Sequence, residues 1–173
     1  MSSLDILKEI LEHKYRLENQ NCLIEQNIDN KGKKFTVKYN IVKNNEIKYE
    51  LFRFNSDAFP FFKNISGLKK MCDYILFSEV KGKLYIFVIE LKLSNESAKK
   101  QLEAATEFVK FILNSSKRIG TEIKNYEIKK IRICENKTKK RNKMSAAKAF
   151  DFDENGFCDY SFKDVHLEPL MRY

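Results

Sequence analysis

The sequence predicts an α/β fold in which a mixed central β-sheet is flanked by helices. Two segments have the dense apolar pattern of buried strands, another strand pattern follows them, and two segments repeat apolar residues at helical spacing. In chain order these segments are residues 4–18 (helix), 72–77 (strand), 84–92 (strand), about 94–113 (helix) and 126–133 (strand). Helices and strands that follow one another along one chain pack as layers around a shared core.

The N-terminal part is predicted to form a helix and then a β-hairpin. Apolar residues from Leu4 to Tyr15 recur at helical spacing, and Ser3 can cap the N-terminus of this helix. Residues 35–42 and 47–54 are rich in β-branched and aromatic residues and are separated by a polar, turn-like segment. We therefore expect these two segments to pair with each other.

The central elements have the clearest patterns. Residues 84–92 begin apolar on both strand faces, which is typical of a strand in the middle of a sheet that is covered on both sides. Ser94 is the expected N-cap of the helix that follows. The buried stripe of that helix consists of Ala98, Leu102, Ala105, Val109 and Ile112. No repeat or linker interrupts the chain, so residues 1–173 are expected to form a single domain.

The composition favours some classes of protein and excludes others. Lys and Arg number 33 against 24 Asp and Glu, and the net charge of +9 favours a polyanionic partner, nucleic acid first and an anionic membrane surface second. No apolar run is long enough for a membrane span, and the first residues lack a signal-peptide pattern. The cysteines are scattered without a CxxC pair, which favours reduced thiols in a cytoplasmic protein. Neither GxGxxG nor GxxxxGK[ST] occurs, which disfavours a Rossmann or P-loop nucleotide site.

Two charged residues follow the apolar part of the second strand. Glu90 and Lys92 are two residues apart and therefore project from the same strand face, where unpaired charges cost several kcal/mol. If residues 72–77 and 84–92 form a hairpin with a tight turn at residues 81–82, opposed residues have numbers that sum to 163. Asp73 then lies opposite Glu90, with Cβ atoms roughly 4.5–5.5 Å apart.

Such a pair of carboxylates favours a bound metal ion. Two close negative charges repel each other, and a divalent cation relieves that repulsion. Oxygen ligands with open coordination positions suit Mg²⁺ or Mn²⁺. The alternative interpretation of the same spacing is a metal-free, salt-bridged trio of Asp73, Lys92 and Glu90.

These residues resemble a known motif. Asp73, sixteen intervening residues and then Glu90-Leu91-Lys92 are similar to the PD-(D/E)XK motif of restriction-endonuclease-like nucleases. The order of predicted elements over residues 4–135 is also similar to the restriction-endonuclease-like core, which has a helix, an antiparallel β-meander with the acidic residues, a helix and a further strand. Cys72 stands where the family often has proline, and the motif is short and tolerant.

The resemblance implies roles for particular residues. Asp73 and Glu90 would bind the catalytic Mg²⁺ or Mn²⁺ together with the main-chain carbonyl of Leu91. Lys92 would orient the attacking water and offset charge on the phosphate. Gln101 matches a glutamine that many members carry in the helix after the motif, and the alternative is an ordinary glutamine on a helix flank.

The resemblance also suggests further ligands in the first helix. Family members often place a glutamate there that contacts the metal through water, and some use a histidine. Glu12, Glu18 and His13 fit by position, and the alternative for each is a solvated surface side chain.

Several basic residues are candidates to contact phosphates. These are Lys69, Lys70, Lys99, Lys100, Lys139, Lys140 and Arg141. The last three belong to a basic stretch at residues 137–143, for which a solvated loop is the alternative.

Together the patterns lead us to expect an Mg²⁺- or Mn²⁺-dependent nuclease that hydrolyses phosphodiester bonds of nucleic acid, DNA rather than RNA. Restriction, phage defence, repair or a mobile element would suit such an enzyme. A single domain leaves little room for sequence recognition, so loops, a homodimer or a partner protein would supply specificity. The alternative is a non-catalytic nucleic-acid-binding or protein-interaction module on a degenerate nuclease fold.

Overall fold

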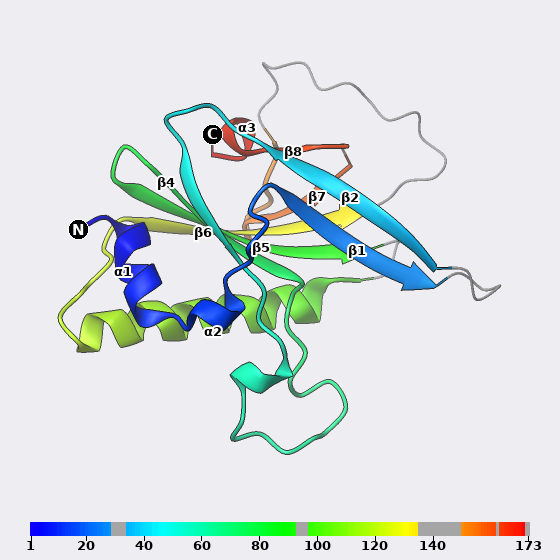
Figure 1. Cartoon of the computed structure of the whole chain (residues 1–173), viewed down its shortest axis with the longest axis horizontal. Helices are drawn as coiled ribbons and strands as arrows, with labels where there is room; N and C mark the ends of the chain where they lie inside the picture. The colour runs from blue at the N-terminus through cyan, green and yellow to red at the C-terminus, as the bar shows by residue number, and fades with distance from the viewer. Residues whose placement is uncertain (29–33, 93–96, 135–149, 162, 172–173) are drawn as a thin grey trace.

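The computed structural model describes residues 1–28, 34–92, 97–134, 150–161 and 163–171 (Figure 1). The helical elements are α1 (Ser3–Ile10), α2 (Lys99–Arg118), α3 (Leu167–Met171) and the 3₁₀ turns η1 (His13–Tyr15) and η2 (Ser56–Ala58). The strands are β1 (Cys22–Ile28), β2 (Lys34–Val42), β3 (Lys48–Phe52), β4 (Tyr74–Val80), β5 (Lys83–Lys92), β6 (Tyr126–Cys134), β7 (Phe157–Tyr160) and β8 (Val165–His166).

The main sheet is mixed and has β5 at its centre. Its strand order is β3-β4-β5-β6-β7, in which the β3–β4 and β4–β5 pairs are antiparallel and the β5–β6 and β6–β7 pairs are parallel. This arrangement confirms the predicted α/β class with a mixed sheet. Residues 84–91 of β5 are all buried, as their apolar pattern predicts for a strand covered on both faces.

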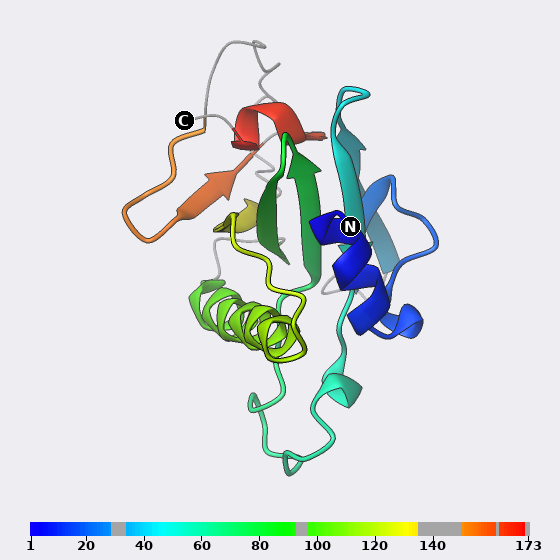
Figure 2. The same ribbon diagram turned by 90° about the vertical axis from the view of Figure 1, so that its left-hand side faces the viewer.

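The two faces of this sheet are covered by different elements. One face packs on α1 and α2 through side chains such as Leu7 and Val109. The other face packs on β1, β2 and α3 through side chains such as Leu23 and Leu170. Figure 2 shows the sheet between α2 on one side and α3 on the other. The smaller sheet has the order β1-β2-β8.

The predicted hairpin between residues 35–42 and 47–54 is wrong. β2 pairs antiparallel with β1, whereas β3 pairs antiparallel with β4 in the other sheet. Asn44 Oδ1 accepts hydrogen bonds from the backbone N–H groups of Glu46 and Ile47, and Ile47 is buried. This local turn redirects the chain from one sheet to the other, so the two strands do not meet.

The first helix is shorter than the predicted 4–18. α1 ends at Ile10, and its N-cap is Ser2 rather than Ser3. The Ser2 hydroxyl accepts a hydrogen bond from the N–H of Asp5, and the Asp5 carboxylate accepts one from the N–H of Ser2. This reciprocal capping box places an acidic side chain in the first turn, where it complements the helix dipole.

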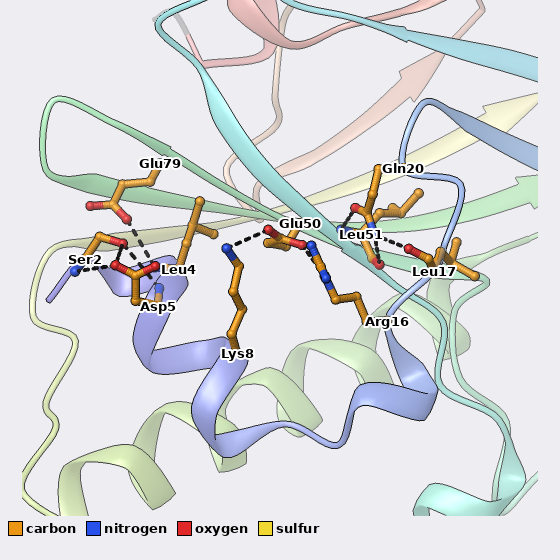
Figure 3. Close-up of polar contacts among 10 residues, drawn as sticks. All are labelled: Ser2, Leu4, Asp5, Lys8, Arg16, Leu17, Gln20, Glu50, Leu51 and Glu79. Carbon is orange, nitrogen blue, oxygen red and sulfur yellow. Dashed lines mark hydrogen bonds and ion pairs between the residues drawn. The ribbon is translucent and has the colours of Figure 1, made fainter.

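Backbone pairing with β3 explains why the helix stops early. The N–H of Leu17 donates to the carbonyl of Leu51, so this segment uses strand-like bonds where a longer helix would use internal ones. In the same region, Glu50 of β3 is buried and forms ion pairs with Lys8 at 2.9 Å and with Arg16 at 2.6 Å (Figure 3). These contacts fasten α1 and the segment after it to the sheet.

The helix after β5 confirms its predicted stripe. Ala98, Leu102, Ala105, Val109 and Ile112 are all buried. Ala98 is the N-cap residue and makes no side-chain capping bond, whereas the predicted cap Ser94 lies outside the described residues. α2 also continues past residue 113 to Arg118. Within the described part of the chain, no helix is long and apolar enough to cross a membrane.

Candidate active site

The β4–β5 hairpin has the register that the spacing predicts. Tyr74 pairs with Ile89 and Val80 pairs with Lys83, so opposed residue numbers sum to 163. Lys81 and Gly82 form the turn with positive φ angles of 48° and 74°. Positive φ at both central residues is characteristic of the type I′ turn, whose twist matches that of an antiparallel pair.

This register brings Asp73 to the end of β5. Asp73 directly precedes β4, and its Oδ2 accepts a hydrogen bond of 2.7 Å from the N–H of Leu91. Extending the register by one residue beyond the Tyr74–Ile89 pair puts Asp73 opposite Glu90, the position expected from the sequence. Alternation along β5 puts Glu90 on the face of Ile86 and Val88, the face that packs on α2.

Glu90 is buried, and only one of its two carboxylate oxygens has a polar partner among the described residues. The residue is 5% exposed, and its Oε1 lies 2.7 Å from the ammonium nitrogen of Lys92. Its Oε2 is buried and has no hydrogen-bond partner among the described residues. A buried carboxylate oxygen without a partner costs free energy, so this atom has unused capacity to bind a cation or a proton.

The pKa values reflect burial and the close approach of the two acids. Burial raises the pKa of Glu90 to about 7, the negative charge of Asp73 adds to this effect, and Lys92 opposes it. Burial also raises the pKa of Asp73, while the hydrogen bond from Leu91 and the charges of Arg53 and Lys92 oppose the increase. Buried acids whose pKa values are raised in this way are typical of functional sites, and structural ion pairs can cause the same shift.

The donor set fits a magnesium-like ion with protein ligands on only part of its shell. Asp73 and Glu90 supply carboxylate oxygens, and the free Oε2 of Glu90 is the atom best placed to accept a new ligand bond. No group of three or more His, Cys, Asp or Glu side chains capable of holding a metal ion occurs within the described ranges. Mg²⁺ commonly keeps several waters and takes only one or two carboxylates from the protein.

The proposed extra ligands from the first helix are not brought to this pair. Glu12, His13 and Glu18 are exposed, and none of them forms a metal-binding group with described residues. The prediction assumed that all three lie on one helix. Because α1 ends at Ile10, they belong to the connecting segment that pairs with β3.

Gln101 is in the first turn of α2, because the helix begins at Lys99. Its side chain is half-buried and makes no hydrogen bond to the described residues. Lys70, Lys99 and Lys100 are exposed, and Lys69 is half-buried. Lys139, Lys140 and Arg141 lie outside the described residues.

Two basic residues of β6, which the sequence offers only as possible phosphate contacts ahead of the basic stretch, lie on the face of the acidic pair. Arg132 is the register partner of Glu90, and Lys130 is that of Val88, so both side chains share the face of the acidic pair. Arg132 donates two hydrogen bonds to the carboxylate of Asp159, at 2.5 and 2.8 Å. The alternation of residues 126–134 indicates that Lys130 and Arg132 share one strand face. Only the parallel register with β5 shows that Glu90 lies on the same face.

A hollow adjoins these residues. It has a volume of about 340 Å³ and lies between the first turn of α2 and strands β6 and β7, with Lys99, Lys130 and Arg132 in its lining. Glu103 and Asp153 also line it, so the hollow carries charges of both signs. It offers a concave surface on the same side of the sheet as Glu90.

Comparisons of the chain with protein-family models, with curated proteins and with solved structures each found no match. The features that point to a function are the geometry of Asp73, Glu90 and Lys92 and the motif that these residues form.

Proposed function

We propose that this protein is a metal-dependent nuclease that hydrolyses phosphodiester bonds of nucleic acid, with DNA as the first substrate to test. The observation that carries the proposal is the state of Glu90. Its Oε2 is buried without a partner beside Asp73, while Lys92 lies 2.7 Å from Oε1. Two acids at the end of one hairpin can hold a metal ion that assists phosphodiester hydrolysis, and a lysine beside them can stabilise the negative charge of the transition state.

Asp73 and Glu90 would hold the metal ion, and the family resemblance adds the main-chain carbonyl of Leu91. Bound there, Mg²⁺ or Mn²⁺ would polarise the phosphate and lower the pKa of an attacking water. The hydrogen bond from the N–H of Leu91 orients the Asp73 carboxylate before any ligand arrives. The raised pKa of Glu90 means that this side chain must lose a proton near neutral pH before it can bind a cation.

Lys92 has a role of its own in this proposal. The ammonium group is held beside the acidic pair by Glu90, on the same strand face. From that position it would orient the attacking water and donate a hydrogen bond to a phosphate oxygen, where negative charge grows in the transition state. An ammonium held in advance needs little reorganisation at the moment of reaction.

The substrate class follows from charge. The net charge of +9 favours a polyanion, and Lys130 and Arg132 line a hollow on the face of the acidic pair. The exposed Lys70, Lys99 and Lys100 add positive charge. Such lysines bind the phosphate backbone without regard to base sequence.

The test is an incubation of the purified protein with labelled single- and double-stranded DNA and RNA, in Mg²⁺, Mn²⁺ or EDTA. We expect cleavage with a divalent ion, none in EDTA, and none with Asp73→Asn, which keeps the size and the hydrogen-bond acceptor. Glu107→Gln is the matched control, because Glu107 is an exposed acid on α2 that pairs with Lys110. Cleavage that survives in Asp73→Asn would contradict the assignment.

A non-catalytic module is the second candidate. The observation in its favour is that Glu90 pairs with Lys92 and Asp73 bonds to Leu91, so the cluster is partly satisfied without a metal. Calorimetric titration with Mg²⁺ or Mn²⁺ separates the two functions. A nuclease binds the ion through Asp73 and Glu90, whereas a purely structural trio does not.

A further inference from the structure

A large apolar surface lies outside the proposed nuclease site. The segment between β3 and β4 contains η2 and projects past α2 in both views (Figures 1 and 2). Phe61 in this segment is 75% exposed, and Phe111 on α2 is 62% exposed. We define the apolar face as the exposed side chains Phe61, Phe62, Leu68, Phe111 and Ile119.

Two neighbouring hollows make this face continuous. The larger has a volume of about 540 Å³, and Phe111 and Ile119 are in its lining. The smaller has a volume of about 270 Å³, and Phe61, Leu68 and Phe111 are in its lining. Ala58, Phe108 and Phe111 line both hollows. The face therefore combines a largely exposed aromatic side chain, Phe61, with an apolar groove that extends beside it.

The exposed area is what a stable dimer needs. The five side chains of the apolar face expose roughly 500 Å² in total, since a whole aromatic side chain covers about 150–250 Å². The largest apolar patch on a typical monomer covers about 300–600 Å², so this one lies near the upper end. A homodimer interface of about 800 Å² per partner that is about 65% apolar requires a similar apolar area.

The charges around the face favour a second copy over a polyanion. Glu9, Glu12 and Arg118 border the larger hollow, and Lys70 and Glu107 border the smaller one. With three glutamates against one arginine and one lysine, the rim lacks the excess of positive charge that a nucleic acid or an anionic membrane requires. A rim with both signs can instead complement its own copy, in which residue i contacts residue j and j contacts i.

We propose that the apolar face is the interface of a symmetric homodimer in which Phe61 of each copy inserts into the groove beside Phe111 of the other. A flat lipid surface cannot fill a groove, whereas an exposed phenylalanine of a second copy can. The proposal does not depend on hydrolysis, because none of the five side chains belongs to the acidic pair or to Lys92. Dimerisation and nuclease activity can therefore fail independently.

Sedimentation equilibrium over a range of protein concentrations tests this interface, in about 0.5 M salt so that bound nucleic acid is released. We expect the wild type to reach twice the monomer mass. Phe61→Ala should raise the dimer dissociation constant at least about 30-fold, the size expected when a central aromatic residue is truncated. Phe111→Asp should leave only monomer, because it places a charge in the groove.

Val42→Ala is the control, because Val42 is an exposed apolar residue on β2, away from the apolar face. It should dimerise as the wild type does. Circular dichroism and thermal melting of each variant show that the change acts on association and not on folding. A wild type that stays monomeric, or a dimer that both apolar-face variants leave intact, would overturn the proposal. A monomer that binds anionic vesicles through Phe61 would overturn it in favour of a membrane.

Discussion

The N–H of Leu91 donates a hydrogen bond of 2.7 Å to the carboxylate of Asp73, so the residue between Glu90 and Lys92 holds the acid that faces Glu90. The bond joins the chain just before β4 to the end of β5. Asp73 is thereby fixed although it lies outside the regular ladder. The side chains on either side of Leu91 are left to interact with each other, as the Lys92–Glu90 ion pair shows.

Removing the ammonium group of Lys92 is predicted to impair cleavage without preventing metal binding. Lys92→Met keeps most of the side-chain length but removes the ammonium beside Glu90. We expect at least about a 100-fold loss of cleavage, typical of removing one group that stabilises transition-state charge. Binding of Mg²⁺, measured by calorimetry, should persist. Lys110→Met, which changes an exposed lysine on α2, is the control. Near-wild-type cleavage by Lys92→Met would remove the lysine from the mechanism.

Glu90 should make the metal-free protein less stable as the pH rises. Burial raises its pKa from 4.5 to about 7, so the folded state binds this proton more tightly than the unfolded state does. The resulting stabilisation is complete below about pH 4.5 and is lost as the pH rises through about 7. The loss amounts to about 3 kcal/mol in the free energy of unfolding.

The measurement is urea unfolding in EDTA from about pH 5 to about pH 8. Glu90→Gln cannot titrate, so the difference between the wild type and this variant isolates the contribution of Glu90. Mg²⁺ should reverse the trend, because it competes with the proton and stabilises the deprotonated carboxylate. If the difference in unfolding free energy between the wild type and Glu90→Gln does not change with pH, the pKa of Glu90 is not raised by folding.

The Glu50 cluster is predicted to be structural. Glu50→Gln removes the negative charge that pairs with Lys8 and Arg16, so both cations lose their ion pair with residue 50. The free energy of unfolding should fall by about 1–3 kcal/mol. Chemical denaturation measures this, with the exposed Glu46→Gln as the control. The cleavage rate of the folded variant should match the wild type, and a selective loss of cleavage would place Glu50 in the reaction.

The basic stretch at residues 137–143 is predicted to contact the phosphate backbone. Each contact adds about 0.7–0.9 to the slope of log affinity against log salt, so neutralising Lys139, Lys140 and Arg141 should reduce it by roughly two to three units. A Glu90→Ala background prevents cleavage while binding is measured in a salt series. Equal slopes with and without the triple change would mean that the stretch is only solvated.

Most of the central fold and the acidic pair could be predicted because their signals are local. The apolar pattern of residues 84–92 indicates a central strand, and one two-residue turn sets the register that places Asp73 against Glu90. Within a single hairpin the turn fixes which residues face each other, so the sequence numbers of two residues determine whether they lie close together.

The predictions that were wrong or incomplete share one cause, which is the pairing of segments that are far apart in the sequence. Propensity alone continues the first helix to residue 18, whereas in the structure α1 ends at Ile10 and the backbone of Tyr15 and Leu17 bonds to the segment of β3. The partner of β2 is β1 because a local turn at Asn44 separates it from β3. Arg132 meets Glu90 only through the parallel ladder between β5 and β6, which no local pattern specifies.

The two-residue turn between β4 and β5 has a consequence for how the protein folds. Asp73, Glu90 and Lys92 lie within residues 73–92, so bringing them together closes one short loop and costs little chain entropy. Hairpins form in about 1–10 μs, whereas the parallel pairing of β5 with β6 must wait for the crossover through α2. The acidic pair can therefore meet early, and the cost of holding its charges together falls on the first steps of folding.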